Sequence, residues 1–444
     1  MVPFSSLLFQ FEHPKVWKKQ IIENLGSLKR YVDYIKEGEE FEEYKKKMKA
    51  ELHGVIDQAA EPAKDINSLS VRLGDALEHL SKGMIFDTGV DPSHLLKHSN
   101  KITLGKKLQP WCNQLNMNVN HIVNDGYGIM GLINKFKGVP AIVVLAGPSL
   151  KNNRDELKRI GNKAIIIAVD TSFRPLLDIG VEPHIVVAHD ANHNGAKFFL
   201  PKDFFPETSL NDLKEQELMM AVEQLKQQKP EILKKWNYKT LACFVNYISP
   251  LNIQSYCGDM VSFYSVFDPS LPVYQTMAHA TNWRVTKDGK MLAHDKGGIL
   301  GGSSVGHVAF YLAHAMGCNP ITFTGMDLSY PNNLTYVEGS SNQKDMSKIK
   351  LVDVLDLSNR PVKTNISMFS YRTVFQAMLP QLIAQSNISV YNSTEHEDGS
   401  PTGILEVGAE PKRLKHFIDE FCTKDIPEVS NIRELVKKDR DGVN

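Results

Sequence analysis

Small and polar residues follow three apolar runs in the middle of the chain, and their types suit an anionic ligand. A glycine turn in front of a helix exposes N–H groups at the positive end of the helix dipole, which favours a phosphate. Carboxylates nearby could hold ribose hydroxyls, a base amine or a metal ion. The residues are Gly147, Pro148, Ser149, Asp170, Thr171, His189 and Asp190.

Each of these residues also has a plain structural explanation. Ser149 could do no more than cap the helix that follows it, and Asp170 could do no more than end a strand. Polar residues at three successive strand ends are harder to explain in this way. Their combination favours a site for a nucleotide or a similar ligand.

The apolar runs themselves predict the elements that position these residues. Ala141–Ala146, Ala164–Val169 and His184–Ala188 are short and rich in Val and Ile, which is typical of buried parallel strands. Helices are predicted between them, from Ser149 to about Gly161 and over Thr171–Ile179. This order predicts an α/β, Rossmann-like, mostly parallel sheet with right-handed crossovers, whose strand ends share one edge.

Later segments add weaker candidates at the same predicted edge. Further strands are predicted over Thr240–Val245, Pro320–Thr324 and Ile388–Tyr391. Gly297–Gly317 predicts a second glycine-opened helix with hydroxyls at its start, and an aromatic loop follows the strand that ends at Thr324. The additional candidates are Asn246, Gly302, Ser303, Ser304, Gly325, Asp327, Tyr336, Asn392 and Ser393.

Composition narrows the class of protein. The 444 residues include 51 basic and 51 acidic side chains, so nothing favours nucleic acid or an anionic membrane as the partner. Five cysteines form no CxxC pair, which indicates neither a disulfide scaffold nor a zinc site. No signal-peptide pattern and no apolar stretch of about 18 residues is found, so we expect a cytoplasmic protein without a membrane span.

Three parts are expected along the chain. Residues 1–135 are predicted to be mainly helical, with a guessed role in acceptor recognition, and residues 136–405 to form the α/β domain. Residues 406–444 are predicted to be a helical tail, helical to about Phe421 and then polar and frayed. Residues 262–295 are irregular, which suits a functional loop and an ordinary surface loop equally.

Five blocks occur in order between roughly Phe136 and Gly403: PAIVVLAGPSL, AVDTSFRPLLDIGVEPHIVVAHD, GGSSVGHVAFYLAHAMGCNPITFTGMDLSYP, TYVEG and VYNST. Together they resemble one family, the motility-associated factor glycosyltransferases of flagellated bacteria, and five blocks are more specific than one glycine motif. The core also resembles bacterial sialyltransferases and is shared with 6-hydroxymethylpterin diphosphokinase-like proteins.

The resemblance implies an enzyme that moves a nonulosonic acid from its CMP-activated form to a Ser or Thr hydroxyl of flagellin. It implies that Gly147, Pro148 and Ser149 contact the CMP, and that Ser303 and Ser304 donate to the phosphate or the sugar carboxylate. Likeness to sialyltransferases implies an inverting reaction. No cofactor or metal is expected, because the leaving group carries a single phosphate.

A general base must take the proton of the acceptor hydroxyl. His189 is favoured over His279 and His307, and Asp190 and Asp327 are the carboxylate candidates. A histidine in such a position is often only structural.

Two other functions stay open. A 6-hydroxymethylpterin diphosphokinase would use Mg-ATP, with Mg²⁺ held by Asp170, Asp190 and Asp327. Such enzymes resemble the core alone, whereas this chain carries well over a hundred further residues before it. A non-catalytic binding protein would bind the nucleotide without turnover.

Overall fold

The computed structural model divides the chain into two compact units that alternate along the sequence. One comprises Met1–Met130, Val245–Asn252 and Ser262–Leu300, and the other comprises Gly131–Phe244, Ile253–Val261 and Gly301–Asn444. The residues that the structure describes are 118, 122–123, 127–189, 198–199, 238–245, 260–266, 282–285, 290–302, 304–340, 346 and 351–441. Most of the mainly helical region predicted over residues 1–135 lies outside them.

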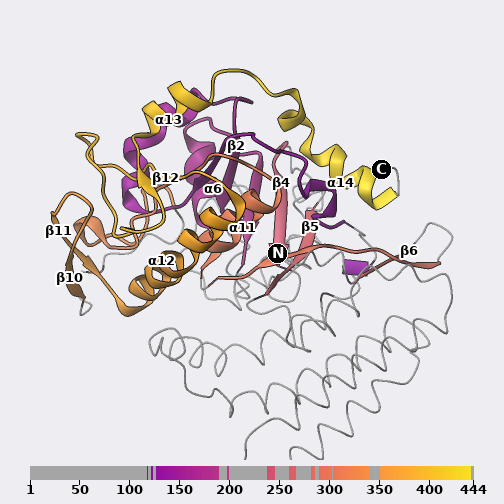
Figure 1. Cartoon of the computed structure of the whole chain (residues 1–444), viewed down its shortest axis with the longest axis horizontal. Coiled ribbons are helices and arrows are strands. Elements are labelled where there is room, and N and C mark those ends of the chain that lie inside the picture. Colours follow the sequence, from indigo (N-terminus) through magenta and orange to yellow (C-terminus); the bar gives the residue numbers. More distant parts are fainter. Residues whose placement is uncertain are drawn as a thin grey trace, which may run out of the picture. The chain divides into compact units, whose positions relative to one another are not determined.

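The second unit is built on a parallel sheet, as the sequence predicts (Figure 1). Its strands run in the order β13-β12-β9-β1-β2-β3-β4, and every pairing between these neighbours is parallel. All of β1, β2, β3 and β9 is buried, as expected for strands covered on both faces. The strands are β1 (Ala141–Val144), β2 (Ile165–Val169), β3 (Ile185–Ala188), β4 (Leu241–Val245), β9 (Ile321–Thr324), β12 (Val390–Asn392) and β13 (Glu410–Pro411).

Helices cover both faces of this sheet. Right-handed crossovers place α5 (Arg154–Lys158) and α6 (Asp170–Asp178) on one face, and α11 (Val305–Ala315) and α12 (Ile366–Ser386) on the other. Figure 1 shows α11 and α12 lying together in front of the sheet. Phe310 of α11, Phe323 of β9 and Phe375 of α12 pack their rings against one another on that face.

The helix after β1 is shorter than predicted. A 3-10 helix, η4 (Pro148–Asn153), comes first, and α5 then extends over only five residues. Pro148 fixes the start of η4, because its ring presets φ for a helical turn and it has no N–H to satisfy.

The tail is more ordered than predicted. Beyond α13 (Leu414–Phe421), a short 3-10 turn leads into α14 (Ile432–Asp441), where fraying was expected. Val436 of α14 is fully buried, and Arg433 donates to the Thr240 carbonyl over 2.7 Å. The polar composition of α14 concealed a narrow apolar stripe that faces the rest of its unit.

Two elements of this unit were not predicted. β10 (Val352–Leu355) and β11 (Pro361–Thr364) form an antiparallel hairpin outside the main sheet. The two-residue strand β13 extends the sheet beyond β12. Neither shows the long apolar run that marks the central strands.

The first unit contains short strands where the sequence predicts irregular structure. β5 (Met260–Val266) and β8 (Gly298–Leu300) pair in parallel, and β6 (Trp283–Val285) pairs antiparallel with β7 (Met291–Ala293). Their apolar runs are too short to stand out from a loop. Among the described residues, no helix combines the length and apolar character needed to cross a membrane.

Candidate functional site

The carboxyl ends of the parallel strands bring several of the predicted residues to one edge of the sheet. Gly147 follows β1, Asp170 follows β2, His189 follows β3, and Gly325 with Asp327 follow β9. Such an edge is where open α/β sheets bind their ligands. Asp190, Asn246 and Ser303 lie outside the described residues, as does His279.

Ser149 does not cap a helix, contrary to the sequence-based expectation. Its side chain makes no capping bond within η4; instead the hydroxyl donates to Asp327 Oδ2 over 2.8 Å. The backbone N–H of Ser149 donates to the same oxygen over 3.1 Å. The hydroxyl donates to the carboxylate after β9 because a charged, buried acceptor forms the stronger hydrogen bond.

Glycine is needed at position 147 because a side chain would clash with neighbouring residues of the protein. The backbone there has φ −62° and ψ 155°, which any residue can adopt. A Cβ, however, would lie 2.0 Å from Asp327 Oδ2 and 2.5 Å from the Gly325 carbonyl oxygen. Glycine therefore permits the close approach of Asp327 to the turn.

The turn after β1 has no spare N–H for a phosphate. Gly147 N–H donates to the Gly325 carbonyl over 3.0 Å, and Pro148 has no N–H. Ser149 N–H is bound to Asp327, and Leu150 N–H donates to the Gly147 carbonyl. The predicted cradle is thus already filled by a protein carboxylate.

Burial controls the protonation of Asp327. This side chain is 2% exposed, and burial raises its pKa to about 6, although the two Ser149 hydrogen bonds and the nearby His396 act in the opposite direction. Its second oxygen, Oδ1, is buried without a hydrogen-bond partner. Asp327 can therefore change charge close to neutral pH.

The N-terminus of α11 does have N–H groups to offer. Ser304 stands at the N-cap in an extended conformation, but its side chain makes no capping bond. Among the described residues, nothing accepts a hydrogen bond from the N–H of Val305 or Gly306. A Cβ on Gly306 would lie 2.7 Å from Leu145 Cδ2, so this helix end lies against the residue that follows β1.

The hydroxyl of Ser304 is engaged inside its own helix. Ser304 Oγ lies 2.8 Å from His307 Nδ1, and the His307 ring stacks on Phe375 with 3.6 Å between the ring centroids. Gly302 is required here, since a Cβ would lie 2.0 Å from the His307 Cβ. The glycine-serine block therefore packs around a buried histidine.

Two histidines at this edge are neutral at physiological pH. Burial lowers the pKa of His189 to about 4 and that of His307 to about 3, because a charged ring would lose its hydration. The electrostatic effect of His189 contributes to the lowering at His307, so the two rings influence each other. His189 Nε2 is buried without a hydrogen-bond partner.

Three further described candidates, Asp170, Ser393 and Asn392, form hydrogen bonds within the protein. Asp170 begins α6, is 6% exposed, and accepts from the Thr171 N–H over 2.7 Å. Ser393 Oγ lies 2.8 Å from Thr322 Oγ1, and the Asn392 side chain accepts from the Thr394 N–H while its Nδ2 has no hydrogen-bond partner. Tyr336 lies in the loop after β9.

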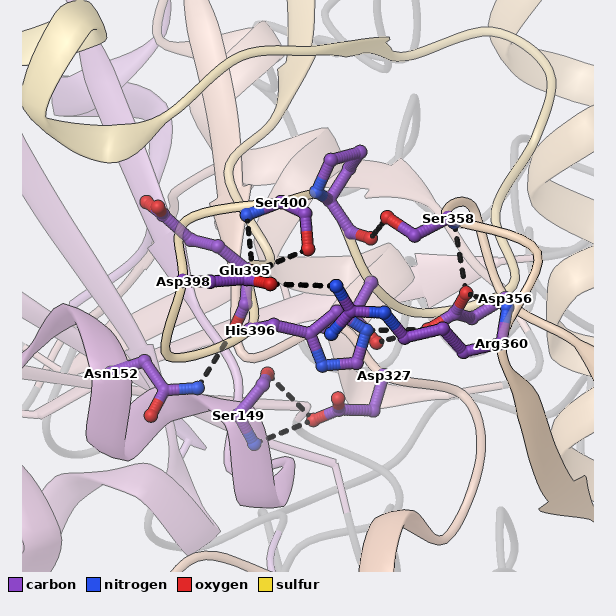
Figure 2. A network of polar contacts seen from close by, with 12 residues as sticks. Ser149, Asn152, Asp327, Asp356, Ser358, Arg360, Glu395, His396, Asp398 and Ser400 are labelled. Atoms are coloured by element: carbon purple, nitrogen blue, oxygen red, sulfur yellow. Dashed lines mark hydrogen bonds and ion pairs between the residues drawn. The ribbon is translucent and has the colours of Figure 1, made fainter.

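Residues just after β12 complete this edge, and sequence reasoning treated them only as a turn. Asn153 of η4 donates to Glu395 Oε1 over 2.7 Å, and Asn152 donates to the Glu395 carbonyl over 2.8 Å. His396 Nε2 lies 2.6 Å from Asp356 Oδ2, as Figure 2 shows. Glu395 and His396 could have been predicted as site residues, because they follow a predicted strand. Nothing in the sequence marks Asp356.

The described residues contain no cluster of side chains suited to binding a metal ion. None of their His, Cys, Asp and Glu side chains form a group of three or more that could hold an ion.

One part of the chain matches a known family. Residues 113–267 fit the family model described as 6-hydroxymethylpterin diphosphokinase MptE-like. This segment is therefore similar to MptE-like domains. It contains β1 to β4 and therefore the Gly147 turn, Asp170 and His189. Asp327, α11 and the residues after β12 follow the MptE-like match in the sequence and complete the same edge.

A solved structure is also similar to the chain. It is described as a MAf glycosyltransferase from Magnetospirillum magneticum AMB-1, with a TM-score of 0.42 and 12% sequence identity. The match covers 86% of this chain and 46% of that one, so this chain spans just under half the length of that protein. A likeness of this size carries no argument about activity. No curated protein sequence matches the chain.

Proposed function

We propose that the chain is a glycosyltransferase that moves a nonulosonic acid from a CMP-activated donor to Ser or Thr hydroxyls of flagellin. The proposal rests on the five sequence blocks, because the structural likeness is too low to carry it. The match to the MptE-like family model is compatible with it, since the core of the resembled family is shared with 6-hydroxymethylpterin diphosphokinase-like proteins.

One observation supports the site: the uncapped N-terminus of α11 opens at the edge that also holds the Ser149–Asp327 pair. Val305 and Gly306 offer N–H groups at the positive end of an eleven-residue helix. The donor phosphate fits there better than at Gly147, where the N–H groups are already bonded. In this arrangement Asp327 holds the Gly147–Ser149 turn in place, and the turn lines one side of the proposed site.

The same helix end suits the chemistry of transfer. As the acceptor oxygen attacks the anomeric carbon, the bond to the phosphate breaks and negative charge builds on CMP. N–H groups fixed beforehand in the folded protein stabilise that charge without reorganising. The proposed reaction needs no metal, because CMP leaves with a single phosphate.

A mass measurement on flagellin tests the proposal. Purified chain, flagellin and a series of CMP-nonulosonates are incubated together, and intact flagellin is weighed by mass spectrometry. We expect an added mass of one or more nonulosonic acid residues with at least one donor. A flagellin that keeps its mass with every donor, while the chain remains folded, would contradict the proposal.

The diphosphokinase alternative is favoured by the description of the matched family. Asp327 Oδ1 has no hydrogen-bond partner and could serve as one ligand of Mg²⁺, while Asp170 would be a second. Thermal unfolding with CMP and with Mg-ATP separates the two functions. Stabilisation by Mg-ATP alone would support the kinase, and stabilisation by CMP without transfer to any acceptor would support a binding protein.

A further inference from the structure

A histidine and a carboxylate form a bonded pair beside the proposed site. His396 Nε2 lies 2.6 Å from Asp356 Oδ2. A carboxylate can only accept in such a contact, so Nε2 carries the proton and the lone pair is left on Nδ1. The described residues make no other hydrogen bond to this ring, so Nδ1 is available as a proton acceptor.

Asp356 is held in a single position by the loop around it. Its Oδ1 accepts from the N–H groups of Ser358 and Arg360 over 2.8 and 2.9 Å. Its Oδ2 accepts from Thr402 Oγ1 over 3.0 Å as well as from His396. The side chain is completely buried, whereas that of His396 is 23% exposed. A saturated, buried carboxylate that orients a reachable imidazole is the arrangement of an activated base.

The pair belongs to the same cluster as the Gly147–Ser149 turn. The residue before His396, Glu395, is bonded to both Asn152 and Asn153 of η4. His396 also acts electrostatically on Asp327, the partner of Ser149. Figure 2 draws the imidazole ring beside the carboxyl group of Asp356, with Asp327 in the same view.

We propose that His396, oriented by Asp356, is the catalytic residue that removes the proton from the acceptor hydroxyl. This inference rests on the proposed glycosyl transfer. The acceptor O–H bond breaks and its proton moves to His396 Nδ1, while the oxygen forms a bond to the anomeric carbon. The bond from that carbon to the phosphate breaks, and CMP leaves with the electron pair. The imidazolium then releases its proton to water.

His396 is better placed for this role than the residues favoured from the sequence. Asp327 is 2% exposed, and one of its oxygens is occupied by two Ser149 donors. Burial holds the pKa of His189 near 4, which makes its ring a weak base. The hydrogen bond to Asp356 fixes the His396 ring with Nδ1 as the atom that can take the proton.

Other charged side chains near the His396–Asp356 pair form ion pairs with one another. Arg360 is bonded to Asp398 over 2.6 Å, and Lys151 is bonded to Glu397 over 2.8 Å. Arg413 lies 3.3 Å from Glu395.

Replacing the imidazole tests the proposal in the full chain with flagellin and an accepted CMP-nonulosonate. His396→Gln keeps an N–H donor for Asp356 but cannot take a proton. We expect kcat to fall by about 100-fold, within the usual range for loss of a general base, with the KM for the donor nearly unchanged. His416→Gln, at an exposed position on α13, is the matched control and should keep the wild-type rate.

Chemical rescue separates a base from a structural histidine. Added imidazole should raise the rate of H396G at least tenfold and leave the wild type and H416Q unaffected. Asp356→Asn should also lower kcat, whereas Asp398→Asn, at the exposed Arg360 pair, should not. Wild-type kcat in H396Q, or an H396G that folds but is not rescued, would overturn the role of His396 alone. A wild-type chain that is inactive with every donor would overturn both the function and this role.

Discussion

Ser149 gives both its hydroxyl and its backbone N–H to one oxygen of Asp327, although the two residues are 178 positions apart. This contact ties the end of β1 to the end of β9, where the strands already pair in parallel. It also changes the expected role of the Gly-Pro-Ser turn, because the turn binds a carboxylate of the protein.

Ser149→Ala removes one of the two donors to a buried carboxylate. We expect the free energy of unfolding to fall by about 1–3 kcal/mol, the usual cost of depriving a buried polar group of its partner. Urea denaturation at pH 7 measures the change. Ser430→Ala, at an exposed hydroxyl that bonds only to the Pro427 carbonyl, should stay within about 0.5 kcal/mol of the wild type.

Asp327→Asn should change the pH dependence of stability. The folded protein holds the Asp327 proton up to about pH 6, whereas the unfolded chain releases it near 3.8. Protonated Asp327 therefore favours folding at low pH, and this advantage is lost as pH rises between these values. Relative to the wild type, D327N should become more stable by about 3 kcal/mol from pH 4 to pH 8. A constant difference between the two unfolding curves would contradict the burial of this charge.

His307 should make the protein sensitive to acid. Its pKa is about 3 in the folded chain and near 6.5 when exposed, so the unfolded state takes up a proton first as pH falls. The stability that neutral His307 provides is complete above pH 6.5 and declines toward pH 3. His307→Gln should flatten the acid limb of stability by on the order of 4 kcal/mol, and H416Q should leave it unchanged. Denaturation at a series of pH values provides the measurement.

Gly147→Ala should be destabilising for a steric reason. The new methyl group would lie 2.0 Å from Asp327 Oδ2, so the turn or the carboxylate must move. We expect a loss of about 1–3 kcal/mol, which is typical of overpacking. Gly161→Ala is the comparison, since its Cβ meets nothing within 4 Å and its cost comes only from φ +53°. A G147A variant with wild-type stability would show that Gly147 has room for a side chain.

Val436→Ala tests whether the C-terminal helix is part of the folded unit. Val436 is fully buried, so the loss of two methyl groups should cost about 2 kcal/mol. Lys438→Ala, on the exposed side of α14, should cost less than about 0.5 kcal/mol. If V436A has the same stability as the wild type in thermal or urea unfolding, the result would support the frayed tail expected from the sequence.

The central strands were predictable because their signal is local. An apolar run such as Ile165–Val169 must be buried on both faces, and the short connection to the next run leaves only a parallel crossover. By contrast, β10 is largely exposed, β11 is buried only at alternate residues, and β6 and β7 extend over only three residues each. Such segments pair because of their surroundings, so the sequence gives little sign of them.

The candidate site was predictable only as a set of strand ends. Asp170, His189, Asp327 and Asn392 were found in this way, since a residue that follows a parallel strand must lie at the carboxyl edge. Their individual roles remain predictions. Asp356 could not be found, because it lies in the turn of a hairpin that reaches the edge only in the folded chain.

The order of apolar runs and the polar residues that end them determined the sheet and its ligand-binding edge, because both depend on neighbours within a few positions. Tertiary structure alone decided that Asp327 accepts a hydrogen bond from the N–H group of Ser149 and that Asp356 orients His396. Those contacts join residues 178 and 40 positions apart, and they form only when folding brings buried charges to the donors that can satisfy them.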